Sequence, residues 1–264
     1  MKLLRTTLAT CLLTGLAAAQ SEATVIVTYA EQPGIVASTF IHSSTYDFNS
    51  LTAGVHSNVA WDGVGSFDTL NILNADQYGG ANNSMYAVEG LGSVSKTILN
   101  LNSPSSYFGL WWSAGDAANV IDFYSGAGGT GTLVAEFTTT NLLKALGGAY
   151  KGNPTPGPFL GKDAGEPFAF INFFATPNSA WSSVVFKNSA GSGLEADNYA
   201  SRVAVYDPTT DGPMPGVVLE AINGKTEVSL VPEPNATMAM ILIGAVSFSS
   251  TLLRRFKKTT PLKA

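Results

Sequence analysis

The stretch that decides the fold class is Asn119-Val-Ile-Asp-Phe-Tyr124, then Ser125-Gly-Ala-Gly-Gly-Thr-Gly131, then Thr132-Leu-Val-Ala-Glu-Phe137. Both flanks are rich in β-branched and aromatic residues, which favour strands. The glycines between them allow the positive φ angles of a tight reversal. The sequence therefore predicts two antiparallel strands and a glycine-rich turn. A dinucleotide-binding loop has similar glycine spacing, but it needs a helix directly after the glycines.

The region from Gln20 to Glu233 has the same texture, with short apolar runs separated by Gly, Asn, Asp, Ser and Pro. Turn signals recur about every eight to twelve residues, a spacing typical of β-sandwiches. We predict an all-β protein, a β-sandwich of jelly-roll type, with one short helix over 139–146 and long loops over 152–166 and 207–216. The other clear strand candidates are 24–30, 94–101, 106–113, 168–175, 182–187 and 200–206.

The N-terminus has the layout of a secretory signal peptide over residues 1–19. Lys2 and Arg5 precede an apolar run, and three alanines end at Ala19, where we expect signal peptidase to cleave. Cleavage would remove Cys11, the single cysteine of the chain. The mature protein would then have neither a disulfide nor a thiolate metal site.

The formal charge of −5 conceals an asymmetry between the ends of the chain and its middle. Between Glu22 and Glu233 there are nineteen acidic and seven basic residues, which gives a formal charge of −12. Nucleic-acid binding needs clustered Lys or Arg, so no nucleic-acid partner is expected. Cations or neutral sugars are favoured as partners instead.

An uncharged stretch lies near the C-terminus, over residues 236–253, and a basic cluster follows it over 254–258. Eighteen residues in a helix span roughly 27 Å, close to the hydrocarbon thickness of a bilayer. We predict one transmembrane helix at 236–253. Basic residues stay on the cytoplasmic side, so an ectodomain at 20–230 would face outward.

Val231-Pro-Glu-Pro234 directly precedes this helix and Arg254-Arg255 directly follows it. This order resembles the PEP-CTERM sorting signal of exported proteins in Gram-negative bacteria and cyanobacteria, over residues 231–258. The resemblance implies an exosortase-like membrane transpeptidase as partner. It would recognise Pro232, Glu233 and Pro234, while Arg254 and Arg255 would hold the helix in the inner membrane. The mature protein would then reach the cell surface or the extracellular space.

The ectodomain is also similar to a family of exosortase-dependent surface proteins best represented in cyanobacteria. The similar segments are 111–116, 121–124, 152–154, 166–170 and 193–198. The chain departs from this family at Leu194, where Phe is commoner. The resemblance implies a location and no activity.

Trp111 and Trp112 are neighbours, so on a strand their side chains point to opposite faces. One of them could stack on a sugar ring, unless both are packed under loops. Asp116 and Asp122 adjoin these aromatic strands and complete a candidate ligand site. Glu195, Asp197 and Asn198 form a second group. Their oxygen atoms suit calcium, and the alternative is that they are solvated turn residues.

No catalytic motif is evident in the sequence. The only histidines, His42 and His56, lie in Ser, Thr and Asn surroundings, and there is no Gly-x-Ser-x-Gly elbow. We therefore expect a protein that is not an enzyme, with a structural or glycan-associated role in the envelope or in an exopolysaccharide-rich biofilm matrix. The alternative is a secreted carbohydrate-active hydrolase that uses two carboxylates.

Overall fold

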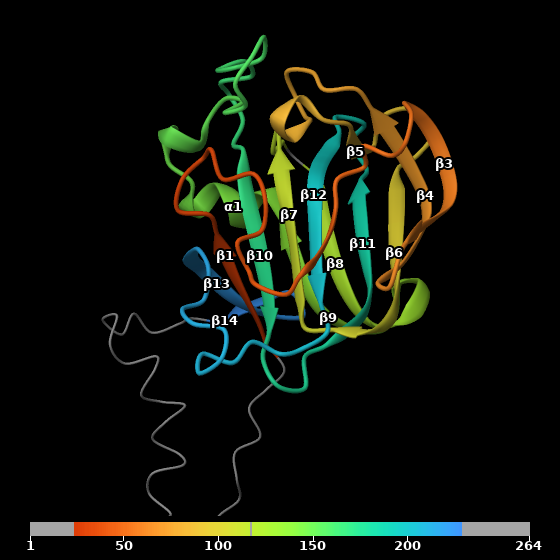
Figure 1. Ribbon diagram of the computed structural model, residues 1–264, viewed down its shortest axis with the longest axis vertical. Coiled ribbons are helices and arrows are strands. Elements are labelled where there is room, and N and C mark those ends of the chain that lie inside the picture. The colour runs from red at the N-terminus through yellow and green to blue at the C-terminus, as the bar shows by residue number, and fades with distance from the viewer. Residues whose placement is uncertain (1–23, 117, 229–264) are drawn as a thin grey trace, which may run out of the picture.

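The computed structural model describes residues 24–116 and 118–228, which form an all-β protein built from one curled antiparallel sheet (Figure 1). Its strands are β1 (Val25–Tyr29), β2 (Ser44–Tyr46), β3 (Gly54–Trp61), β4 (Gly65–Leu73), β5 (Tyr86–Glu89), β6 (Lys96–Ser105), β7 (Tyr107–Ser113), β8 (Asn119–Gly126), β9 (Thr130–Thr138), β10 (Ala169–Ala175), β11 (Trp181–Asn188), β12 (Leu194–Arg202), β13 (Val217–Asn223) and β14 (Thr226–Val228). The helical elements are α1 (Thr139–Ala145) and the 3-10 turns η1 (Ala81–Asn83), η2 (Ala127–Gly129) and η3 (Gly148–Tyr150).

The strand order in the sheet is β14-β13-β1-β10-β7-β12-β5-β4-β6-β11-β8-β9, with β2 paired to β12 and β3 paired to β4. The sheet curls until its two ends meet. Gly224, in the turn between β13 and β14, donates its N–H to Val134 of β9 and accepts the N–H of Glu136. Because the ends meet, the inner face of the sheet encloses a core.

Side chains alternate between the inner and the outer face along each strand. On β7, Phe108, Leu110 and Trp112 point inward and join the main hydrophobic core. Tyr107 and Trp111 point outward into a second buried cluster.

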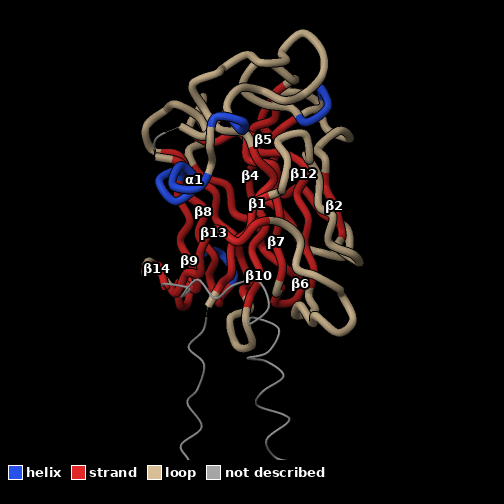
Figure 2. The backbone as a smooth tube through the Cα atoms, turned by 90° about the vertical axis from the view of Figure 1, so that its left-hand side faces the viewer, coloured by secondary structure: helices blue, strands red, loops and turns tan. Residues whose placement is uncertain are grey.

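The second cluster lies on the outer face of β7, β10 and β12 and is covered by loops. Val36 and Phe40 belong to it, the ring of Phe40 packs against Phe174, and Tyr206 and Met214 lie at its border. Figure 2 shows loops over much of the molecule's upper end, whereas β14 lies at the lower end. Strands β7 and β10 are consequently buried on both faces.

The structure confirms the predicted hairpin, which is β8 and β9 around η2, and the predicted short helix, which is α1. It corrects the strand expected at 200–206. The observed β12 starts at Leu194 and ends at Arg202, and the following residues form a loop. The predicted signal peptide at 1–19 and sorting signal at 231–258 lie outside the described residues. Within the described ranges no helix is long and apolar enough to cross a membrane.

Candidate functional site

Trp111 and Trp112 occupy opposite faces of β7, as their adjacency predicts. Both have an exposed fraction of 0%. The ring of Trp112 packs edge-on against Phe137 in the core, and the ring of Trp111 packs against Phe168 in the outer cluster. Neither indole therefore offers an open face to a sugar ring. Both tryptophans are buried, and neither is exposed for stacking.

Asp116 lies three residues after the end of β7, among other carboxyl groups. It accepts a hydrogen bond from the Ser192 hydroxyl at 3.0 Å, and burial raises its pKa. Burial, a hydrogen bond with Asp163 and the charges of Asp163 and Asp116 raise the pKa of Glu166 to about 8. Burial and neighbouring acids, first among them Asp116, raise the pKa of Glu195 to about 9. This part of the molecule thus gathers acids that resist ionisation.

Glu195, Asp197 and Asn198 lie on β12 and not in a turn. Asp197 and Ala200 flank a register shift, and Asn198 there has a φ of 50°. Asp197 is buried, which raises its pKa to about 7. Its Oδ2 accepts hydrogen bonds from the Ala81 N–H at 3.0 Å and from the Ser84 hydroxyl at 2.5 Å, and its Oδ1 accepts one from the Asn198 N–H at 2.6 Å.

Calcium binding by these residues stays a prediction. The side-chain amide nitrogen of Asn198 donates to the Val36 carbonyl at 2.8 Å, and both carboxylate oxygens of Asp197 already accept hydrogen bonds. A calcium ion would have to compete with these donors for Asp197. In the part of the chain that the structure describes, no group of three or more His, Cys, Asp or Glu side chains is arranged to hold a metal.

Replacing Asp197 by alanine is expected to destabilise the protein by about 2 kcal/mol, because three donors lose their acceptor and two of them belong to the segment around Ala81. Urea unfolding measures this loss. Asp207→Ala serves as control, since Asp207 is exposed and binds only within its own loop. Equal losses in both variants would show that Asp197 does not tie the loop to β12.

Asp122 lies apart from the two tryptophans, on the outer face of β8 in the opposite half of the curled sheet. Its side chain is 2% exposed, and its Oδ2 lies 2.6 Å from the Lys187 Nζ of β11. The Tyr124 hydroxyl donates to the same oxygen at 3.2 Å, whereas Oδ1 has no hydrogen-bond partner in the part of the chain that the structure describes. The structure therefore does not bring Trp111, Trp112, Asp116 and Asp122 together as one site.

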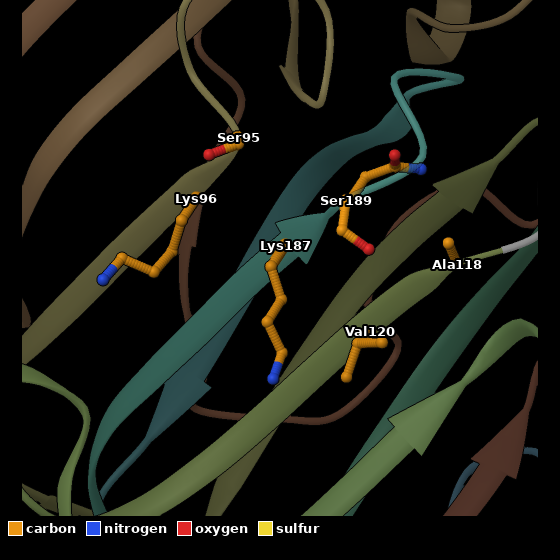
Figure 3. Close-up of a pocket in the computed structure, with 7 residues that line it drawn as sticks. Ser95, Lys96, Ala118, Val120, Lys187 and Ser189 are labelled. Carbon is orange, nitrogen blue, oxygen red and sulfur yellow. The ribbon is translucent and has the colours of Figure 1, made fainter.

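A pocket of about 340 Å³ opens beside the Asp122–Lys187 ion pair. Figure 3 shows the side chains of Lys96 and Lys187 on neighbouring strands, with their amino groups pointing in different directions, and Ser95 and Ser189 nearby. It is lined by Ser95, Lys96, Ala118, Val120, Lys187, Asn188 and Ser189. A smaller pocket, of about 140 Å³, is lined in part by His42, Ser105 and Arg202.

Sequence reasoning singled out Asp122, whose ion-pair partner Lys187 lines this pocket, but it singled out neither Lys187 nor Lys96. Lys96 and Lys187 are far apart in the chain and meet because β6 and β11 pair in a register that opposes them. No local pattern reveals such a register. The strand alternation does give one usable signal, since it places Asp122 and Val120 on the same face of β8.

The predicted sorting residues Pro232, Glu233, Pro234, Arg254 and Arg255 lie outside the described residues. In the comparisons with known proteins, no family model matches the chain and no curated protein matches it. The pocket and the cluster of acidic side chains around Asp116 are therefore interpreted from their own chemistry.

Proposed function

We propose that this is an exported, exosortase-sorted protein of the bacterial cell surface or extracellular matrix, with a non-catalytic, glycan-associated role. The observation that carries the proposal is the order of the last segment, in which Val231-Pro-Glu-Pro234, an uncharged stretch and Arg254-Arg255 follow one another. We further propose that the curled sheet is a β-sandwich of jelly-roll type, a fold often used by sugar-binding domains.

The position of the pocket supports the glycan-associated role. It lies on the outer face of β6, β11 and β8 and combines hydroxyl, cationic and apolar groups, as polar-ligand sites do. The formal charge of −12 between Glu22 and Glu233 disfavours a densely charged polyanion as partner. A neutral or sparsely charged polysaccharide fits both observations.

A carbohydrate-active hydrolase remains the second candidate, and the cluster of acidic side chains around Asp116 favours it. Glu195 and Glu166, with pKa values raised to about 9 and about 8, could serve as proton donors at neutral pH, as the acid of a glycosidase must. The two pockets described above do not include these carboxylates. Release of reducing ends from the host's polysaccharide by the wild-type protein, and its loss in Glu195→Gln, would favour this second function over the first.

Deleting Pro232 to Pro234 is expected to abolish processing of the tail, because the exosortase would lose the residues it recognises. The measurement is the mass of the protein recovered from its native host. Wild-type protein is expected to lose the segment after the motif, and the deletion variant is expected to keep it and stay in the membrane fraction. Deletion of Pro213 to Pro215, in a described loop, is the control and should leave tail processing intact. Identical masses for wild type and the tail variant would contradict the sorting proposal.

A further inference from the structure

Lys96 and Lys187 are direct cross-strand neighbours on the outer face of the sheet. They are register partners in the ladder between β6 and β11, and both line the pocket of about 340 Å³ (Figure 3). Like charges placed opposite each other destabilise an antiparallel pair. Only seven basic residues occur between Glu22 and Glu233, so the pairing of two of them calls for a negatively charged group nearby.

Asp122 supplies only part of that negative charge. Its buried carboxylate holds the Lys187 Nζ at 2.6 Å and so fixes the direction of the Lys187 side chain. Among the described residues Lys96 makes no ion pair. Two lysines and one aspartate leave a net positive charge of one at the pocket. A ligand group with a single negative charge balances it.

The remaining lining restricts the ligand further. Ser95 and Ser189 contribute hydroxyl groups, which can donate or accept hydrogen bonds. Val120 and Ala118 contribute apolar surface. Sites for small molecules usually start at about 300 Å³, so this pocket suits a ligand about the size of one sugar ring.

We infer that the pocket binds a uronate, a sugar ring bearing one carboxylate, within a polysaccharide of low charge density. The carboxylate would contact the two lysines, the ring hydroxyls would contact the serines, and the apolar C–H face would lie on Val120 and Ala118. Phosphate-rich chains fit less well, because their charge density opposes the acidic ectodomain. The inference rests on the proposed function, since it names the sugar class that a glycan-associated protein would take.

The test measures binding of methyl glucuronide to the full-length chain in a mild detergent by isothermal titration calorimetry. Methyl glucoside, which lacks the carboxylate, and acetate, which lacks the sugar, are the comparison ligands. We expect a Kd on the order of 1 mM for methyl glucuronide, because a single sugar makes few contacts. Both comparison ligands should bind at least tenfold more weakly.

Variants locate the site. Lys96→Met with Lys187→Met should weaken methyl glucuronide binding at least tenfold. Lys96→Met alone should weaken it at least threefold and keeps the Asp122–Lys187 ion pair, so it separates loss of binding from loss of folding. Lys162→Met is the matched control, since Lys162 is an exposed lysine away from the pocket, and its affinity should equal that of the wild type. Unchanged affinity in Lys96→Met and in the double variant would overturn the inference, as would equal binding of methyl glucoside or acetate.

The host's own polysaccharide, tested in parallel, separates this inference from the proposed function. If the wild-type chain binds methyl glucuronide but not the polysaccharide, the pocket assignment holds and the glycan-associated role fails. If wild type and double variant bind the polysaccharide equally, the role holds and the pocket assignment fails. If the polysaccharide is bound by the wild type and lost in the double variant, both hold.

Discussion

Glu89→Gln is expected to stabilise the protein at pH 8 and to reduce the loss of stability that the wild type suffers between pH 5 and pH 8. Glu89 is fully buried on the inner face of β5, and neither of its carboxylate oxygens has a hydrogen-bond partner among the described residues. Burial raises the pKa of Glu89 to about 8, with the charge of Asp68 as a lesser cause. The Tyr199 hydroxyl, which likewise has no hydrogen-bond partner in residues 24–116 and 118–228, faces the same enclosed core.

The sign follows from proton linkage. An acid whose pKa is higher in the folded state holds an extra proton there, between its unfolded pKa near 4.5 and its folded pKa near 8. Stability is therefore greatest at the acidic end of that window and falls as the pH rises through it. Each pKa unit corresponds to about 1.4 kcal/mol, so Glu89 lowers the free energy of unfolding at pH 7 by roughly 3 kcal/mol relative to pH 4.

Urea unfolding at pH 5, 6, 7 and 8 measures this dependence. Glu166, Glu195 and Asp197 also have raised pKa values, so Glu89→Gln should flatten the slope without abolishing it. Glu31→Gln is the matched control, because it makes the same substitution at an exposed position. A slope in Glu89→Gln equal to that of the wild type would mean that Glu89 ionises freely in the folded protein.

Strands β8 and β12 differ in how far their local sequence predicts them. Strand β8 and its partner β9 alternate apolar and polar residues around glycines, and their hairpin was predictable. Strand β12 instead contains Glu195, Asp197 and Asn198 in its first half, and these residue types are depleted in strands. Tertiary packing overrides these local preferences and places the acids in a buried strand, where burial raises the pKa values of Glu195 and Asp197.

The hairpin of β3 and β4 was missed although the sequence carries a signal for it. Asp62-Gly63-Val64 connects the two strands, with the Val64 N–H donating to the Trp61 carbonyl, and Gly63 has a φ of 76°, a conformation that favours glycine. The candidate site was less accessible to prediction. Asp122 could be found beside aromatic residues, but its partner Lys187 and the facing Lys96 depend on a ladder register that only the folded sheet defines.

Gly65→Ala is expected to destabilise the protein by about 3 kcal/mol or more, because added volume in a closely packed position forces the backbone to move. Gly65 begins β4 and lies between β3 and β6, opposite Trp61 on one side and Leu101 on the other. A Cβ atom at Gly65 would come within 2.0 Å of the backbone carbonyl oxygen of Asn100. A backbone atom cannot rotate aside as a side chain can, so the substitution must separate β4 from β6.

Gly34→Ala is the matched control for this substitution. Gly34 is exposed, its φ is not positive, and no atom of the described residues outside its chain neighbours lies within 4 Å of the position that its Cβ would take. Alanine there should leave stability unchanged or raise it by about 0.5 kcal/mol, because it restricts the unfolded chain. Urea unfolding followed by circular dichroism compares the two variants. Similar free energies of unfolding would mean that β4 and β6 do not approach so closely. A large loss of unfolding free energy only in Gly65→Ala would show that the contact between β4 and β6 helps to keep the sheet curled. The same contact would then help to position β6, the strand that carries Lys96.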